Sequence, residues 1–279
     1  MRTTFLTYLD KFTEELALKV EHCQPEDIHK MLVYAITEAA LMKHGFDVNK
    51  FTELVKFRKS LPTPRVRIYK WMLLPISKLL EITAHISENA FKPIIAEEGA
   101  LKKIINALSD LGKVDSVLMY DCLSLPEFLT LSVNLKSRGF KTVFWEYLIN
   151  PLGTTSYVTN QIIDQSYSAV LSEVVRCIAN TLKASYYMKS SYLDKIVHTY
   201  GEAGLEEFLA KIDLESIINE IVSQASGRRI LLMTDHGYDI VLYGSSHIYV
   251  KHGAIKQTKH SKPLVILSKL ALTLVIQGV

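Results

Sequence analysis

The spacing of apolar residues changes near residue 110 and divides the chain into two unlike parts. Over residues 1–110 apolar residues recur with helical spacing, and no segment alternates convincingly between apolar and polar residues. From residue 113 onward, short apolar segments of strand length alternate with longer segments of helical periodicity. This alternation is typical of a mainly parallel sheet flanked by helices. We therefore predict an all-helical N-terminal region over 1–112 and an α/β domain over 113–279.

Proline and glycine delimit the predicted elements. Pro25, followed by two acids, suits a first helical turn, and the apolar periodicity of that helix continues to His44-Gly45. Further helices of the first part are predicted at about 47–60, 65–90 and 94–111. Strands of the second part are predicted at about 114–120, 141–148, 229–234 and 263–267, with a hairpin at 240–250. Helices of the second part are predicted at about 125–136, 155–188 and 203–224.

Composition points to a globular protein of a reducing compartment. The hydrophobic content of 48% and the charged content of 22% are ordinary, and the net charge of +3 is too small to require a nucleic-acid partner. The 3 cysteines are scattered and odd in number, which argues against a disulfide framework. The N-terminus lacks the apolar segment of a signal peptide. The apolar segment 263–279 is interrupted by Lys269 and is short for a membrane span. We expect a cytoplasmic protein without a membrane partner.

Carboxylate and imidazole side chains follow two of the predicted strands. Asp235-His236-Gly237 comes directly after the strand at 229–234, and Asp121 comes directly after the strand at 114–120. The carboxyl ends of strands in α/β enzymes often deliver metal ligands. The alternative for Asp121 is a helix N-cap, a role that Ser124 could also fill.

Hydroxyl side chains stand at the start of the next helix. Thr154, Thr155 and Ser156 follow Pro151 and open the helix predicted from residue 155. A hydroxyl at a helix N-terminus meets free N–H groups and partial positive charge, which suits phosphate binding and an activated nucleophile. Threonine and serine are also good N-caps, so one of the three is expected to cap the helix in either case.

Further ligand types lie towards the C-terminus. Asp194 and His198 are spaced i, i+4, which places both on one face of a helix within reach of one ion. The alternative is an Asp–His contact on the surface. His247, His252 and His260 cluster near the end of the chain, and His260 leads into the strand predicted at 263–267.

The order of these residues along the chain resembles the order of the metal-binding motifs in the alkaline phosphatase superfamily. The chain presents an Asp after the first strand, Pro-x-x-Thr at a helix start, Asp-x-x-x-His-x-x-Gly, Thr-Asp-His-Gly and finally His-x-x-Pro-Leu-Val. Within the superfamily it is most similar to the PglZ-type branch, which occurs in prokaryotic phage-defence systems. The resemblance covers roughly residues 113–267, and residues 1–110 do not contribute to it.

The resemblance implies a metal-dependent phosphoester hydrolase, either a phosphodiesterase or a phosphatase, with a compact alkaline phosphatase-like core. Two divalent ions, zinc or manganese, would flank a threonine nucleophile and depress the pKa of its hydroxyl. The substrate would be a phosphoester, with a nucleotide or nucleic acid as one candidate. Thr154 is the implied nucleophile, three residues after Pro151, and Thr155 is the second choice. The implied ligands are Asp121, Asp235 and His236 for one ion, and Asp194, His198 and His260 for the other.

Two departures from the family pattern keep alternatives open. Asp121 leads into Cys122-Leu123-Ser124 where PglZ-like sequences have a short motif ending in arginine, so a basic contact to the substrate is missing from that motif. His252 competes with His260 as the last ligand. The second hypothesis is therefore a catalytically inactive interaction module that serves, through its helical N-terminal region, in a defence or nucleic-acid-associated complex.

A basic stretch lies in the helical part. No acidic residue occurs between Glu53 and Glu81, and two aromatic residues, Tyr69 and Trp71, stand among the basic ones. Such a stretch could follow a nucleic-acid backbone and stack bases. It could equally be a solvated helix face whose aromatic residues are buried on the other side. The basic residues are Lys56, Arg58, Lys59, Arg65, Arg67, Lys70 and Lys78.

Overall fold

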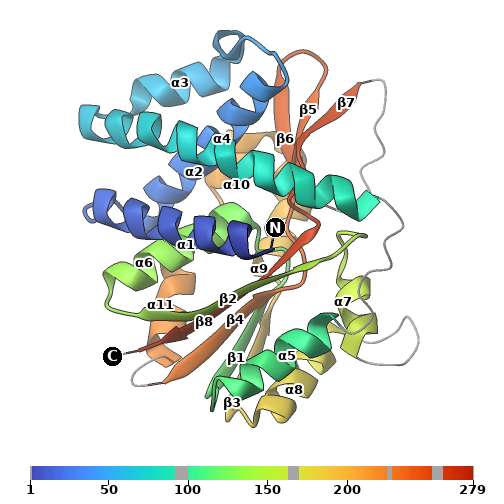
Figure 1. The fold of residues 1–279 in the computed structure, drawn as a ribbon. Helices are drawn as coiled ribbons and strands as arrows, with labels where there is room; N and C mark the ends of the chain where they lie inside the picture. The colour runs from blue at the N-terminus through green and yellow to red at the C-terminus, as the bar shows by residue number, and fades with distance from the viewer. Residues whose placement is uncertain (1, 92–99, 163–169, 225–227, 253–259, 279) are drawn as a thin grey trace.

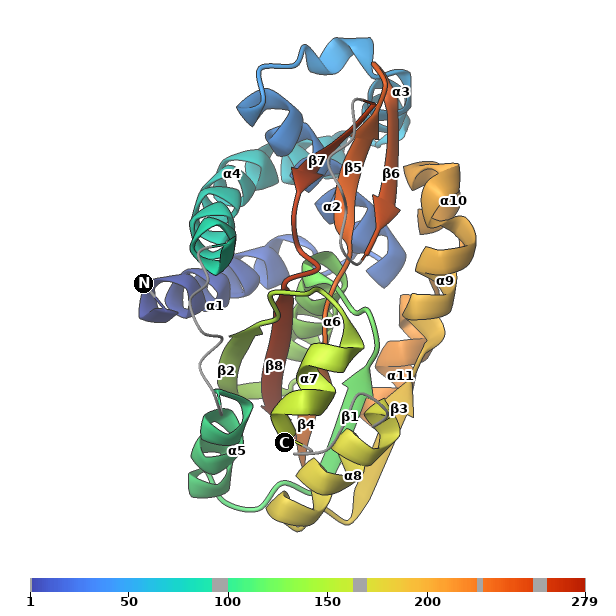
Figure 2. The same ribbon diagram turned by 90° about the vertical axis from the view of Figure 1, so that its right-hand side faces the viewer.

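The computed structural model describes residues 2–91, 100–162, 170–224, 228–252 and 260–278. A five-stranded mixed sheet with helices on both faces forms one end of the molecule (Figure 1). Four N-terminal helices and a second, three-stranded sheet form the other end, as the turned view makes clear (Figure 2). The chain is therefore a mixed α/β protein, as the alternation of segments predicts.

The described residues up to 110 are helical and include no strand. The helix predicted from Pro25 is α2, whose first turn carries Glu26 and Asp27. Of the helix predicted at 94–111, residues 94–99 lie outside the described ranges. No helix in the described ranges is both long and apolar enough to cross a bilayer. The N-terminal helices are α1 (Arg2–Lys19), α2 (Pro25–Lys43), the 3-10 helix η1 (Val48–Lys50), α3 (Thr52–Ser60), α4 (Thr63–Phe91) and α5 (Ala100–Asp110).

The large sheet is mixed rather than mainly parallel. Its strand order is β2-β8-β4-β1-β3, in which β1 is parallel to β3 and β4, whereas β8 is antiparallel to β2 and β4. Strand β8 was not predicted; it follows the last predicted strand after a short turn and inserts between two strands formed earlier in the chain. The strands are β1 (Ser116–Tyr120), β2 (Lys141–Ile149), β3 (Tyr186–Ser190), β4 (Arg229–Thr234) and β8 (Leu270–Gln277).

The helix predicted over 155–188 is wrong at its C-terminal end. The described residues form α7 (Thr155–Ile162) and α8 (Leu171–Leu182), and the chain then continues as strand β3. Lys183 adopts a left-handed conformation with φ 54°, which ends α8. Because β3 is an edge strand with Tyr186 and Tyr187 exposed, it lacks the buried apolar pattern that reveals an interior strand.

The remaining elements pack against one of the two sheets or against the helices that cover them. The helix predicted over 203–224 is divided into two, and the predicted hairpin is present as β5 and β6, with β7 completing a sheet of order β6-β5-β7. The helices are α6 (Leu125–Ser137), α9 (Tyr192–Tyr200), the 3-10 helix η2 (Gly201–Ala203), α10 (Leu205–Leu209) and α11 (Leu214–Gln224). The strands of the small sheet are β5 (Asp239–Tyr243), β6 (His247–Lys251) and β7 (Ser261–Val265).

The core has two clusters, one on each face of the large sheet. Successive residues of β1 point to opposite faces: Val117 and Met119 join the cluster beneath α5, α7 and α8, whereas Leu118 and Tyr120 join the cluster beneath α6. The second cluster continues without interruption into α1 and α2 and includes Phe5. The N-terminal helices therefore share a core with the sheet.

Candidate metal centre

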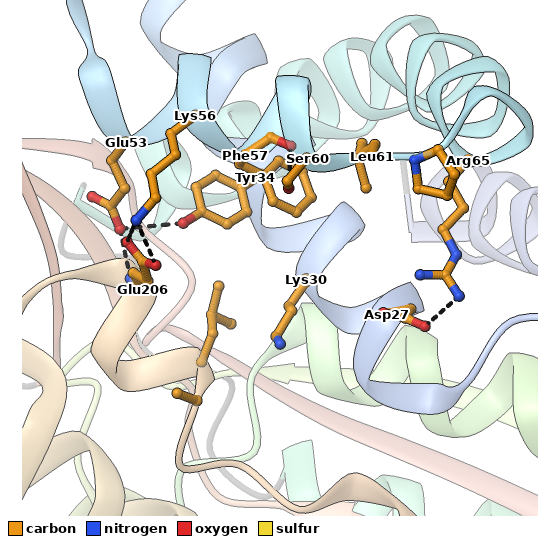
Figure 3. A pocket seen from close by; sticks show the side chains of 13 residues that line it. Asp27, Lys30, Tyr34, Glu53, Lys56, Phe57, Ser60, Leu61, Arg65 and Glu206 are labelled. Carbon is orange, nitrogen blue, oxygen red and sulfur yellow. Dashed lines mark hydrogen bonds and ion pairs between the residues drawn. The ribbon is translucent and has the colours of Figure 1, made fainter.

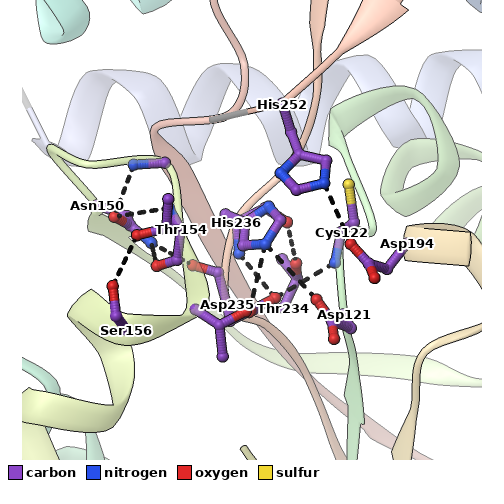
Figure 4. A network of polar contacts seen from close by, with 12 residues as sticks. Asp121, Cys122, Asn150, Thr154, Ser156, Asp194, Thr234, Asp235, His236 and His252 are labelled. Atoms are coloured by element: carbon purple, nitrogen blue, oxygen red, sulfur yellow. Dashed lines mark hydrogen bonds and ion pairs between the residues drawn. The ribbon is translucent and has the colours of Figure 1, made fainter. Parts of the chain in front are cut away.

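The side chains that follow β1 and β4 meet at one edge of the sheet. These strands are parallel neighbours with Tyr120 opposite Thr234, so Asp121 and Asp235 leave the sheet side by side. Asp235 is fully buried and Asp121 nearly so. Figure 4 shows both carboxylates directed towards the imidazole of His236. The local pattern of a strand followed by a polar residue predicts this arrangement.

The imidazole of His236 faces two carboxylates. Its Nδ1 lies 3.0 Å from the carbonyl oxygen of Gly237 and must donate to it, because a carbonyl only accepts. Its Nε2 lies 3.5 Å from Asp121 Oδ1 and 3.5 Å from Asp235 Oδ2. In a neutral imidazole the lone pair of Nε2 would face the two carboxylate oxygens and be repelled by them. A cation or a proton between these three atoms would remove the repulsion. Asp121 Oδ1 is buried and has no hydrogen-bond partner among the described residues.

A second group of ligand types adjoins the first. His252 Nε2 lies 3.2 Å from Asp194 Oδ1 and 2.9 Å from His198 Nε2, and the ring of His252 stacks on that of His236. Asp194 belongs to two sets of atoms that lie within 4.8 Å of one another, one with Asp121 and His236 and one with Cys122 and His252. The residues are therefore close enough to hold a metal ion, and the two groups form one cluster.

His260 lies away from this cluster, and His252 lies where the sequence analysis expected His260. The register of the small sheet explains the difference. Strand β5 leads away from the cluster to Tyr243, and Tyr243 pairs with Ser261 at the start of β7. The exposed His260 precedes Ser261, and its carbonyl accepts a hydrogen bond from the amide of Gly244 in the turn after β5. His260 therefore occupies the far end of the small sheet.

The hydroxyls at the start of α7 have different partners. Thr155 Oγ1 donates to Asp235 Oδ2 at 2.6 Å, so Thr155 touches the carboxylate cluster. Thr154 Oγ1 lies 2.9 Å from Ser156 Oγ and bonds within its own turn. Thr155, the second choice for the nucleophile in the sequence analysis, therefore contacts the carboxylate cluster, whereas the hydroxyl of Thr154 bonds Ser156.

Asn150, which was not among the predicted site residues, fixes the turn before α7. Its amide nitrogen donates to the carbonyls of Asp235 and Thr154, each at 2.8 Å, and its Oδ1 accepts from the amide of Gly153 at 2.9 Å. The signal was its position, since it is an asparagine between a strand and a proline. Asn150 thereby holds the threonines against the end of β4.

Close packing explains the glycine of the Asp-His-Gly motif. A Cβ atom at Gly237 would lie 2.6 Å from Ser124 Oγ and 2.9 Å from the carbonyl oxygen of Leu267. Both distances are too short for a carbon atom, so any side chain would push the motif away from α6 and from the loop before β8. Gly237 is therefore required for the position of His236.

A lysine from the edge strand completes the polar groups. Lys189 Nζ lies 2.9 Å from Asp121 Oδ2 and also bonds Ser191 Oγ. It lines an open cleft of about 430 Å³ beside the cluster. Lys189 could not be identified from the motif after Asp121, because it is distant in sequence and reaches Asp121 only through the pairing of β1 with β3. Polar side chains of the cleft are those of Asp121, Thr155, Ser156, Thr159, Ser172 and Lys189.

Burial dominates the electrostatics of the cluster. It raises the pKa of Asp235, which the neighbouring His236 lowers and Asp121 raises. It lowers the pKa of His252 to about 4, with His236 as the next contribution. Burial likewise raises the pKa of the Cys122 thiol. Closely spaced carboxylates that are removed from water are stabilised by a bound cation.

Four of the seven basic residues of the stretch in α3 and α4 form ion pairs within the protein, and Lys59, Arg67 and Lys70 are exposed. Tyr69 is buried and donates to Glu38 Oε2 at 2.6 Å, and Trp71 stacks on Phe12 at 5.8 Å, so neither ring forms an exposed platform. This matches the interpretation as a helix face with inward aromatic residues. Figure 3 shows two of the ion pairs among residues that line a pocket between α2, α3, α4 and α10. The pairs are Lys56–Glu206, Arg58–Glu38, Arg65–Asp27 and Lys78–Glu81.

No family model matches the chain, and no curated protein matches it.

Proposed function

We propose that this chain is a metal-dependent phosphoester hydrolase of the alkaline phosphatase type, with a threonine nucleophile and two divalent ions, zinc or manganese. The observation that carries the proposal is the buried His236 Nε2 between two carboxylate oxygens, with a threonine hydroxyl on one of the same carboxylates. The PglZ-type branch and its phage-defence context rest on the order of the motifs. The proposed ligands are Asp121, Asp235 and His236 for one ion, and Asp194, His198 and His252 for the other.

The donor atoms suit such ions, since carboxylates and imidazoles are common ligands of zinc and manganese. Bound ions would supply positive charge that stabilises the attacking and departing oxygens of an in-line displacement. His236 fits a ligand role because Nδ1 is held by the Gly237 carbonyl, which leaves Nε2 for the ion. Asp121 fits because one of its buried oxygens has no hydrogen-bond partner among the described residues.

Thr155 is the nucleophile that we favour. Its hydroxyl reaches the carboxylate cluster and lines the cleft, whereas the hydroxyl of Thr154 bonds Ser156. In the first step Thr155 Oγ, having released its proton to solvent, bonds to phosphorus, and the bond from phosphorus to the ester oxygen breaks. The leaving alkoxide takes a proton from water. In the second step a water oxygen bonds to phosphorus, the bond from phosphorus to Thr155 Oγ breaks, and Thr155 Oγ takes back a proton from that water; a monoester thereby yields inorganic phosphate, and a diester yields a phosphate monoester.

The first prediction compares two adjacent threonines. We expect Thr155→Ala to lower kcat for p-nitrophenyl phosphate or its bis-ester by about 10³-fold or more, because it removes the nucleophile. Thr154→Ala is the matched control and should retain activity within about tenfold, because it removes a hydroxyl bound within the turn. The measurement is steady-state hydrolysis with added zinc or manganese, together with elemental analysis of each variant.

The outcomes separate the hypotheses. Loss of turnover in Thr155→Ala with unchanged metal content supports the proposal, and mass spectrometry of the quenched wild type should detect phosphate on the peptide that contains Thr155. Loss in Thr154→Ala instead would transfer the role to Thr154. A wild-type protein that binds less than one equivalent of metal and hydrolyses neither ester would contradict the proposal and favour the inactive interaction module.

A further inference from the structure

Cys122 adopts a backbone conformation that is unusual for cysteine. Its φ is 64°, in the left-handed region, and its side chain is fully buried in the loop between β1 and α6. Glycine would adopt this conformation at a lower cost, because it has no Cβ atom. The thiol makes a weak contact with the carbonyl oxygen of Gly237, at 3.7 Å. A buried residue that is held in a strained conformation indicates a role for its side chain.

The sulfur of Cys122 lies beside two side chains of ligand type, as Figure 4 shows. Cys122 Sγ, a carboxylate oxygen of Asp194 and a ring nitrogen of His252 all lie within 4.8 Å of one another. The amide of Cys122 donates to Asp235 Oδ1 at 3.3 Å, which ties the loop to the end of β4. Cys122 therefore contacts the first group of ligand types through its backbone and faces the second group with its sulfur.

Three atoms of the second group have the spacing of ligands around one ion. Asp194 Oδ1 lies 3.2 Å from His252 Nε2 and 3.5 Å from His198 Nε2, and the two ring nitrogens lie 2.9 Å apart. On a tetrahedral zinc ion, with bonds of about 2.0–2.1 Å, neighbouring nitrogen and oxygen ligands are separated by about 3.3–3.4 Å. These three atoms, the Asp194 triangle, thus approximate one face of a tetrahedron that a fourth ligand would complete.

The type of the fourth ligand decides which ion the site prefers. A thiolate is a soft ligand that suits zinc, whereas manganese prefers carboxylates, carbonyls and water. A bound zinc ion deprotonates a coordinating thiol and releases the proton to solvent, even where burial keeps the free thiol neutral. Cys122 belongs to the stretch in which the chain departs from the family pattern, so a thiolate ligand is a feature of this chain and not of the resemblance.

We infer that Cys122 is the fourth ligand of the ion at the Asp194 triangle and makes this site selective for zinc over manganese. The inference deepens the proposed function, on which it rests for the catalytic use of the ion, by choosing between the two metals. Zinc with four protein ligands can accept a substrate oxygen as a fifth, so a thiolate ligand is compatible with the proposed reaction.

Cobalt(II) is the probe of the thiolate, because it takes the tetrahedral geometry of zinc and absorbs light. We expect the protein, freed of metal and titrated with cobalt, to develop a thiolate-to-cobalt charge-transfer band in the near ultraviolet, which added zinc removes. The band should be absent from Cys122→Ser. It should persist in the double variant Cys23→Ser/Cys177→Ser, which lacks the other two cysteines and serves as the matched control. If Cys122→Ser does not fold, the wild type and the double variant still decide.

Calorimetric titration of the same proteins with zinc and with manganese tests the selectivity. We expect Cys122→Ser to weaken the binding of one zinc ion by about a hundredfold and the binding of manganese by less than about fivefold. The double variant Cys23→Ser/Cys177→Ser should match the wild type with both metals. Equal losses for the two metals in Cys122→Ser, or no loss of zinc binding, would overturn the selectivity.

The outcomes separate this inference from the proposed function. A thiolate band in a wild-type protein that hydrolyses neither nitrophenyl ester would refute the hydrolase and retain the zinc site. Hydrolysis by a wild-type protein whose cobalt form lacks the thiolate band would retain the hydrolase and overturn the inference. A band that persists in Cys122→Ser would overturn it as well, because the thiolate would then come from another cysteine.

Discussion

Asp239 holds the loop on which the candidate centre rests. Its carboxylate accepts the amides of Leu267 and Ser268, each at 2.8 Å, and the Ser268 hydroxyl at 3.0 Å. Ser268 in turn accepts the Gly237 amide and packs against Gly153, so both turns that carry site residues lean on it. Burial raises the pKa of Asp239 to about 6 despite these donors.

This shift predicts a stability that depends on pH. Because the folded pKa exceeds the unfolded value, Asp239 takes up a proton on folding, and its stabilising contribution is complete below about pH 4 and is lost as the pH rises through about 6. Asp239→Asn keeps the acceptor oxygen and does not titrate. We expect the wild type to lose about 3 kcal/mol relative to Asp239→Asn between about pH 4 and pH 7, measured by urea unfolding. If the free energies of unfolding of the wild type and of Asp239→Asn depended on pH in the same way, the raised pKa of Asp239 would be refuted.

A buried glutamate joins three elements behind the centre. Glu127, in the first turn of α6, accepts from His29 of α2 at 2.6 Å and from the Tyr238 hydroxyl at 2.5 Å. Its other oxygen accepts the Ser124 amide at 3.1 Å. All of these groups are buried, so removal of the carboxylate would leave several donors without partners.

Two helices offer a matched comparison. Glu127 is the third residue of α6, and Glu173 is the third residue of α8, where its side chain is exposed. We expect Glu127→Ala to lower the free energy of unfolding by about 3–5 kcal/mol, and Glu173→Ala by less than about 1 kcal/mol, in urea titrations. Similar losses in both variants would mean that the effect comes from the helix dipole rather than from the buried network.

Elements that carry a strong local pattern could be predicted from the sequence. Strands β1 and β4 are continuous buried apolar segments, and α2 has a proline and two acids in its first turn. Strand β3 was missed because it lies at an edge and is half exposed, and β8 because one apolar segment was interpreted as a single strand. Strand pairing decides both cases, and it depends on residues far away in the sequence.

The residues of the candidate centre also fall into those that local sequence predicts and those that depend on distant pairing. The meeting of Asp121 with Asp235 and His236 could be predicted, because Asp121 directly follows β1 and the pair Asp235-His236 directly follows β4. The choice of His252 over His260 could not, because it depends on the register of the small sheet. Lys189 depends on the neighbour of β1, and Asn150 on a turn that closes onto β4. The position of a site residue can thus be predicted when the preceding strand places it. It cannot be predicted when its position depends on pairing with a segment far away in the sequence.

At the scale of the whole molecule, the shared core bears on the predicted boundary at residue 112. Helix α6 packs on α1 and α2, and Phe5 packs edge-on against Tyr147 of β2. We expect residues 113–279 alone to lack a cooperative unfolding transition, because the outer face of α6 would be exposed to water. The measurement is thermal unfolding followed by near-ultraviolet circular dichroism, with the full chain as control. A cooperative transition in the fragment would establish an independent domain.

The position of β8 has a consequence for biosynthesis. The strand lies between β2 and β4, yet it follows every other described element along the chain. During translation β1, β3 and β4 can associate as soon as they leave the ribosome, while β2 stays without a neighbour until residues 270–277 emerge. A nascent chain stalled before that point would expose two strand edges to chaperones or to other chains.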